Sequence, residues 1–105
     1  MPPLKNKVIY LRLGIEDILD IARFHLEKAG LNSARKITSE IEETISRLAE
    51  FPLLGPIHPD PVLAANGYRK LVVSHPYVCV YKLFDDGVYI YRSINGRMDY
   101  PRLLK

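Results

Sequence analysis

Residues 68–94 read YRKLVVSHPYVCVYKLFDDGVYIYRSI and contain three runs of strand length, Tyr68–Ser74, Tyr77–Phe84 and Val88–Ile94. The runs are rich in β-branched and aromatic residues, which favour the pleated, half-buried surface of a sheet. His75-Pro76 separates the first two runs, and Asp85-Asp86-Gly87 separates the last two. Both connections are short enough for antiparallel hairpins, so the stretch predicts a three-stranded meander.

The middle run, Tyr77–Phe84, has hydrophobic residues at both odd and even positions. Because alternate side chains of a strand point to opposite faces, this pattern predicts a central strand. We expect helices from the N-terminal half to cover one face of the sheet, and we expect the opposite face to be free for function.

One more strand and a first helix are predicted before this region. Lys7–Leu13 has strand composition, with polar ends that suit an edge strand. Gly14 is placed as a helix N-cap, and Glu16 and Asp17 then lie in the first turn, where the helix dipole favours negative charge. Gly30 suits the end of this helix. The apolar residues at helical spacing are Ile15, Ile18, Leu19, Ala22 and Leu26.

A second helix is expected after a cap at Asn32 or Ser33. Its apolar stripe consists of Ala34, Ile37, Ile41, Ile45 and Leu48. Residues 52–66 contain four prolines and Gly55, which predicts an irregular connection. The predicted fold class is therefore α+β, with an N-terminal strand and a helical hairpin packed on an antiparallel sheet that the C-terminal meander completes.

The composition indicates a single domain that spans residues 1–105. With 105 residues, of which 48% are hydrophobic, the chain has room for one core. No stretch approaches the roughly 18 apolar residues of a membrane span, and no secretion signal is visible, so we expect no membrane contact and a cytoplasmic location. Cys79, the single cysteine, cannot form an internal disulfide and is expected to be buried.

Basic residues are concentrated towards the C-terminus. The net charge is +3, and residues 68–105 contain seven basic and three acidic residues. Residues 31–67 contain three basic and five acidic residues. The basic surface is therefore expected in the C-terminal half, and the mild excess of positive charge fits an acidic partner without requiring one.

The sequence contains no recognisable catalytic or metal-binding motif. His25, His58 and His75 lie in three unrelated segments, and none forms a spaced ligand pair with Cys79 or a carboxylate. There is also no glycine-rich phosphate loop and no nucleophile elbow. We therefore expect no metal and no cofactor, and an ordinary metabolic enzyme is not supported.

The chemistry that remains consists of cations and a tyrosine in the C-terminal half. Guanidinium groups bind phosphates or carboxylates, and tyrosine rings stack on bases. For the strand cations the alternative is ordinary exposure on a sheet face. Arg97 follows the last strand at a turn, where binding residues often lie, and its alternative is a structural pair with Asp99. The candidate target-binding residues are Arg69, Lys70, Lys82, Arg92, Arg97, Tyr100 and Arg102.

The order of elements and several short segments resemble the RelE/ParE toxins of type II toxin-antitoxin systems. This resemblance covers nearly the whole chain and implies an α+β toxin that a cognate antitoxin, encoded beside it, holds inactive. The ending is more similar to ParE than to RelE. The segments are Phe51-Pro52-x-x-Gly55, Gly67-Tyr68-Arg69, Tyr77-Val78-Cys79-Val80-Tyr81 and Gly96-Arg97-Met98-Asp99-Tyr100-Pro101-Arg102-Leu103-Leu104.

RelE-like members cut messenger RNA in the ribosome with several cations and a C-terminal tyrosine. If this chain were such a nuclease, the resemblance would give the catalytic role to Arg69, Arg97 and Tyr100. Two further cations are missing, because Leu71 and Val78 stand at their positions. One preorganised donor contributes about 3 kcal/mol of transition-state stabilisation. Because two cations are missing, RNA cleavage is the second hypothesis and not the leading one.

ParE-like members poison DNA gyrase and so block replication without covalent chemistry by the toxin itself. The resemblance therefore implies a gyrase inhibitor rather than an enzyme. The alternatives are a ribosome-dependent mRNA interferase and a non-toxic relative that acts as a binding protein. The antitoxin is expected to be acidic or amphipathic, and to fold onto the outer grooves of the helical hairpin and an open sheet edge.

Overall fold

A computed structural model describes residues 6–105 of the chain. The domain predicted for residues 1–105 is therefore described from residue 6 onward, and residues 1–5 lie outside the described part. No helix within residues 6–105 is long and apolar enough to cross a membrane. The elements in chain order are β1 (Val8–Tyr10), α1 (Arg12–Ala29), α2 (Leu31–Ser46), the 3-10 turn η1 (Arg47–Ala49), α3 (Pro61–Ala65), β2 (Arg69–Ser74), β3 (Tyr77–Phe84), β4 (Gly87–Asn95) and the 3-10 turn η2 (Pro101–Leu103).

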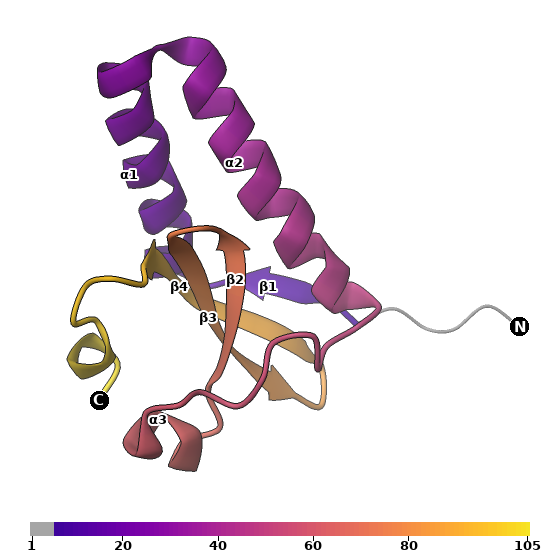
Figure 1. The fold of residues 1–105 in the computed structure, drawn as a ribbon. Helices are drawn as coiled ribbons and strands as arrows, with labels where there is room; N and C mark the ends of the chain where they lie inside the picture. The colour runs from indigo at the N-terminus through magenta and orange to yellow at the C-terminus, as the bar shows by residue number, and fades with distance from the viewer. Residues whose placement is uncertain (1–5) are drawn as a thin grey trace, which may run out of the picture.

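The strands form one sheet in the order β1-β4-β3-β2, and the α1–α2 hairpin lies over one of its faces (Figure 1). This arrangement confirms the predicted α+β fold. β3 is an inner strand, as expected, and β2, β3 and β4 form the antiparallel meander. β1 joins β4 in the parallel direction, so the sheet is mixed rather than fully antiparallel. Strand composition does not predict which neighbour a strand will pair with, or in which direction.

Both helices begin earlier than predicted. α1 starts at Arg12, so β1 is shorter than the expected strand, and Gly14 lies inside the helix rather than at its cap. Gly14 is required for close packing, because a Cβ there would lie 2.9 Å from the carbonyl oxygen of Ile90. α2 starts at Leu31, directly after Gly30, rather than after a polar cap. Gly30 has a φ of 90°, which lets the two helices join without a loop.

The main core lies between the helical hairpin and the sheet. Ile41 and Ile45 of α2 and Ile90 of β4 are fully buried there. Cys79 is also fully buried, as predicted, and burial raises the pKa of its thiol to about 12. This thiol is therefore a small core side chain and not a reactive group.

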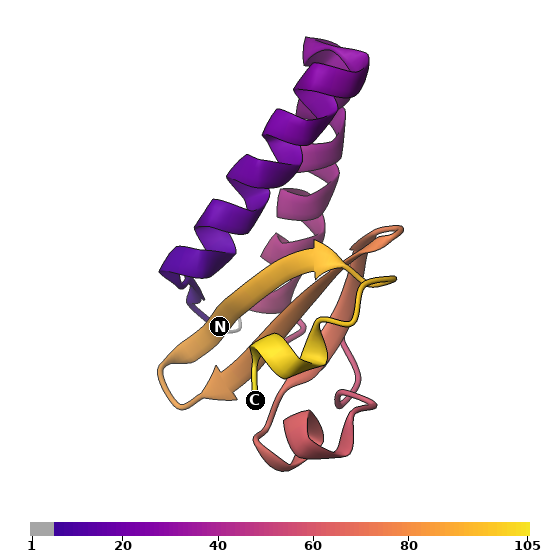
Figure 2. The ribbon, with the colours of Figure 1, turned by 90° about the vertical axis from the view of Figure 1, so that its left-hand side faces the viewer.

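The sheet face opposite the hairpin is partly covered, although we expected it to be free. α3 and the C-terminal segment, residues 96–105, lie across it (Figure 2). Together they form a second core with the far side of β3, whose members are Leu63, Tyr68, Val78, Val80 and Tyr100. Because β3 has apolar side chains on both faces, both faces must be removed from water.

Residues 52–66 are likewise not wholly irregular, because they include the short helix α3. Asp60 caps this helix, since its side chain accepts hydrogen bonds from the amides of Val62 and Leu63 at 2.9 and 3.1 Å. Pro61 occupies the first helical position, where a missing amide proton costs nothing. The helix places Leu63 in the second core.

Candidate functional site

Arg69 and Arg92 are held by contacts within the protein. The guanidinium of Arg92 contacts both carboxylate oxygens of Asp17, at 2.7 and 2.9 Å, and these hydrogen bonds raise the pKa of Arg92. Asp17 also accepts the amide of Ser93 at 2.9 Å. The Nε of Arg69 donates to the carbonyl oxygen of Gly55 at 2.7 Å. Both arginines therefore stabilise the fold, and the N–H groups that make these contacts are not available to a target.

Tyr100 is buried, with 4% of its surface exposed, and is hydrogen-bonded to His58. The Nδ1 of His58 accepts the amide of Asp60 at 3.0 Å, so we assign the ring proton to Nε2, which donates to the Tyr100 hydroxyl at 2.8 Å. Burial, and then the charge of Lys70, lowers the pKa of His58, while burial raises the pKa of Tyr100. The phenol is thus a structural group in the second core.

Arg97 and Arg102 are exposed cations of the C-terminal segment. One guanidinium nitrogen of Arg97 lies 3.3 Å from Nε2 of His75, and its amide donates to the side chain of Asn95 at 2.9 Å, which shapes the turn. Arg102 lies 3.9 Å from Asp99, and both side chains are 78% exposed. Such an exposed pair contributes little, so both arginines are free to meet a partner. Asp99 faces Arg102 rather than Arg97.

The two candidate lysines belong to the sheet face that lies away from the helices. The ammonium of Lys82 lies 4.2 Å from the centre of the Tyr68 ring and 5.3 Å from that of Tyr91. Lys70 pairs with Val80 in the β2–β3 register, and its charge helps to lower the pKa of His58. Both positive charges therefore lie over the second core.

The seven candidate residues do not converge on one centre. Arg69 begins β2, whereas Arg97 lies beside His75, directly after the other end of that strand. At about 3.3 Å per residue, a strand of this length separates them by roughly 20 Å. Leu71 and Val78, where a nuclease would need cations, are 8% and 4% exposed and belong to the two different cores. This arrangement suits contacts over a broad surface rather than phosphoryl transfer at one centre.

The described residues were also compared with the requirements of a metal site. Within residues 6–105, no group of three or more His, Cys, Asp or Glu side chains could hold a metal ion. His25, which donates to or accepts from the Tyr77 hydroxyl at 3.0 Å, links α1 to β3. The histidines therefore act as separate hydrogen-bonding groups.

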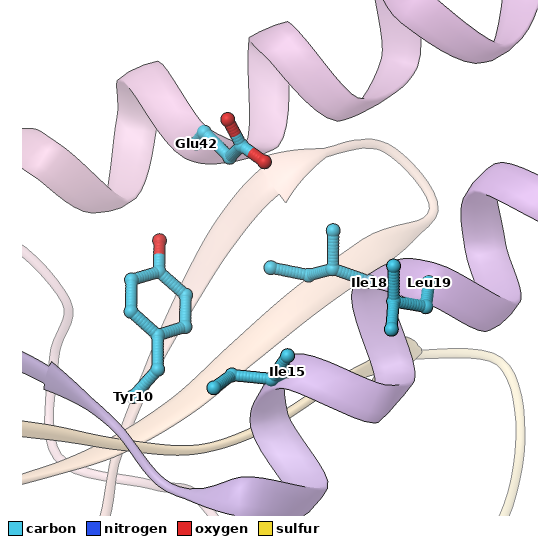
Figure 3. Close-up of a pocket in the computed structure, with 5 residues that line it drawn as sticks. All are labelled: Tyr10, Ile15, Ile18, Leu19 and Glu42. Carbon is cyan, nitrogen blue, oxygen red and sulfur yellow. The ribbon is translucent and has the colours of Figure 1, made fainter.

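A groove of about 330 Å³ lies between α1, α2 and β1. The two helices diverge from their junction towards the sheet (Figure 1). Apolar side chains that line the groove between them are exposed. Ile15 and Leu19 are 49% and 56% exposed, although their spacing placed them on the core face of the helix. Figure 3 shows the residues that line the groove, which are Tyr10, Ile15, Ile18, Leu19 and Glu42.

This groove combines apolar walls with two polar groups. Tyr10 extends from β1 towards α2, and burial raises the pKa of its phenol to about 12 (Figure 3). Glu42 of α2 lies at the opposite rim. A second hollow of about 300 Å³ continues the apolar surface near the tip of the hairpin, with Leu26 and Leu31 in its wall. Helical spacing identified these apolar residues, but it does not distinguish a stripe that the chain covers from one that a partner covers.

Residues 8–100 match the family model of the ParE toxin of the type II toxin-antitoxin system, parDE. The match covers most of the chain, so the chain belongs to this family of toxins, and the predicted RelE/ParE resemblance is confirmed. No curated protein matches the chain in sequence.

Several solved structures have a similar fold. The chain is similar to a chain of the chromosomal ParDE TA system from P. aeruginosa, with a TM-score of 0.74 and 20% identity over 87% of this chain and 96% of that chain. It is also similar to the YoeB dimer from Staphylococcus aureus, with a TM-score of 0.56 and 15% identity over 84% of this chain and 93% of that chain. At these identities the likeness concerns the fold.

Proposed function

We propose that this toxin inhibits DNA gyrase by binding to it, and so blocks replication without covalent chemistry of its own. The observation that supports this most is the burial of the positions that RNA cleavage would need. Leu71 and Val78 are core residues, and the Tyr100 phenol is bonded to His58 instead of facing a substrate. We therefore infer that the toxin acts through its surface, and the ParE-like ending implies gyrase as the target.

The C-terminal segment is the surface that we assign to the target. Arg97 and Arg102 are exposed there, and Met98 between them is 60% exposed. Arginines beside an exposed apolar side chain are typical of the residues that dominate protein interfaces. Among the other candidates, Arg69, Arg92 and Tyr100 would act indirectly, by holding the sheet and the segment in place.

A supercoiling assay with purified gyrase and relaxed plasmid tests this function. We expect micromolar toxin to abolish the gain of supercoils. Full activity of gyrase at that concentration would contradict the proposal. Primer extension on translated messages after toxin expression separates the alternatives, since new cleavage sites would instead indicate an mRNA interferase. Normal growth on expression without an antitoxin would indicate a non-toxic binding protein.

We also propose that a cognate antitoxin occupies the groove between α1 and α2. Its exposed apolar walls suit the apolar face of an amphipathic helix, with side chains three and four residues apart. Glu42 at the rim favours a lysine or arginine at one position of that helix. The ParDE TA system of P. aeruginosa, whose fold this chain shares, supports the expectation of such a partner.

A further inference from the structure

A row of aromatic rings follows the sheet face that lies away from the helical hairpin. Tyr68 and Tyr91 are in edge contact with ring centres 5.1 Å apart, and Phe84 and Tyr89 are in edge contact at 4.9 Å. Lys82 pairs with Tyr89 in the β3–β4 register, and its ammonium lies over Tyr68 and Tyr91. Lys82 therefore connects the two aromatic pairs into one surface.

Two hollows adjoin along this row. The first has a volume of about 330 Å³ and lies between the start of α1 and the C-terminal segment. The second, also of about 330 Å³, lies towards the β3–β4 turn. Leu11 and Tyr91 line both hollows, so they form one groove with Tyr91 at its middle. Tyr91 is partly exposed, and Phe84 at the far end is 50% exposed.

The charge around the groove is mainly positive. Arg12 lines it with a side chain that is 86% exposed, and its contact with Glu16 at 3.4 Å is an exposed pair of little strength. Lys82 adds a second cation above the rings. Among the described residues that line the two hollows, Asp86 is the one acid, and it accepts the Tyr89 hydroxyl at 2.7 Å.

We propose that this groove binds single-stranded nucleic acid, with bases stacked on the exposed rings of Tyr91 and Phe84 and with phosphates beside Lys82 and Arg12. Successive rings along an open groove match the successive bases of a strand, and cations between rings match the phosphates that link them. A duplex has its base faces hidden, so it offers the groove only phosphates. An acidic peptide would use the cations but would leave the row of rings without a stacking partner.

This binding goes beyond gyrase inhibition and involves no cleavage. It is tested with purified toxin and a fluorescein-labelled 12-residue oligothymidylate, by fluorescence anisotropy at low salt, without gyrase. Failure here therefore leaves the gyrase proposal untouched, and failure of the gyrase assay leaves this one untouched. We expect binding with a dissociation constant below about 100 μM, and weaker binding of a 12-base-pair duplex.

Substitutions then separate stacking from charge. Tyr91→Ala is expected to weaken binding about tenfold, while Tyr91→Phe keeps the ring and the affinity. Lys82→Gln is expected to lower the slope of log affinity against log salt by about 0.7, the value for one phosphate contact on a single strand. Asp86→Asn is expected to strengthen binding, because it removes a negative charge from the groove and keeps an acceptor for Tyr89.

Matched controls lie on the helical hairpin. Phe24→Ala removes an aromatic ring that is 52% exposed on α1, and Lys36→Gln removes an exposed cation of α2. Both are expected to bind like the unmodified protein. Equal affinity for duplex and single strand, an unchanged affinity of Tyr91→Ala, or competition by polyglutamate as effective as that by unlabelled oligothymidylate would each overturn the proposal.

Discussion

The neutral imidazole of His58 forms hydrogen bonds with Tyr100 of the C-terminal segment and with the amide of Asp60. Protonation would place a second N–H at Nδ1, where the ring now accepts the amide of Asp60, so this hydrogen bond would be lost. The pKa of His58 in the folded protein lies below its ordinary value of 6.5, so the unfolded chain takes up the proton first as the pH falls. The stability that His58 contributes is complete above its unfolded-state pKa and is lost as the pH falls towards the folded-state pKa.

We therefore predict that the free energy of unfolding decreases from about pH 7 to about pH 5, and that His58→Asn reduces this decrease. Asparagine keeps an acceptor for the amide of Asp60 and does not titrate. Urea unfolding at several pH values measures the effect. Asp60 titrates outside this range, because hydrogen bonds, the largest from the Leu63 amide, lower its pKa below 3.8. An identical pH slope in the variant would show that His58 does not have this role.

Arg92 joins β4 to α1 through its two contacts with Asp17. Asp17 is 8% exposed, so Arg92→Ala would leave a buried carboxylate without its counter-ion. We predict a loss of about 3–5 kcal/mol in the free energy of unfolding. Arg23→Ala removes an exposed arginine that pairs with Asp20, and is expected to cost less than about 1 kcal/mol. Equal, small losses in urea unfolding would contradict a stabilising role for the buried pair.

At the scale of elements, the sequence predicts those whose pattern repeats along the chain. The strands β2, β3 and β4 and both long helices have apolar periods that are visible in the residues themselves. α3 has only five residues, so it shows no such period. It is stabilised by the Asp60 cap and by the packing of Leu63 against β3. The packing of α3 and the C-terminal segment over the second sheet face was likewise not predicted, because no apolar period indicates it. It depends on contacts between distant segments.

The sequence predicted which residues are candidates for the site, but not which of them are exposed and which are bonded within the protein. Arg92 and Arg102 look alike in sequence, yet Arg92 faces Asp17, which lies 75 positions away, and Arg102 faces solvent. Tyr100 also looks available from its place after the last strand, but its partner is His58, 42 positions earlier. Only the fold reveals partners at such separations. The sequence therefore identifies the basic C-terminal half, and the structure separates its structural members from its exposed ones.

The α1–α2 hairpin has a specific role in the proposed antitoxin complex. Leu19 is 56% exposed and lines the groove between the helices. We predict that Leu19→Glu weakens the complex with the antitoxin by at least about 2 kcal/mol, because the carboxylate would lose its water against an apolar helix face. Isothermal titration of purified toxin with the product of the antitoxin gene measures this change.

Leu53→Glu is the matched control, since Leu53 is 66% exposed in the loop that follows η1 and does not line the groove. It should bind the antitoxin with the affinity of the unmodified toxin. If both variants bind equally well, the antitoxin does not use this groove.

At the scale of the whole molecule, the sheet separates two surfaces of different character. The hairpin lies on one side of the sheet and the C-terminal segment lies on the other (Figures 1 and 2). The hairpin side has an apolar groove with Glu42 at its rim, whereas the C-terminal segment carries the exposed Arg97 and Arg102. Seven of the ten charged residues of positions 68–105 are basic, which favours an acidic or nucleic-acid-bound target on that side. We therefore expect the antitoxin and the target to bind through different chemistry on opposite sides of the sheet.

We propose above all that the C-terminal segment binds gyrase and that the toxin does not cut nucleic acid itself. The most direct measurement is the amount of covalent gyrase–DNA complex, trapped with detergent and seen as linear plasmid. The unmodified toxin and Arg23→Ala should both increase it, while the double variant Arg97→Ala/Arg102→Ala should need at least about tenfold more protein. Linear plasmid formed without gyrase, or no trapped complex with micromolar toxin, would contradict the claim.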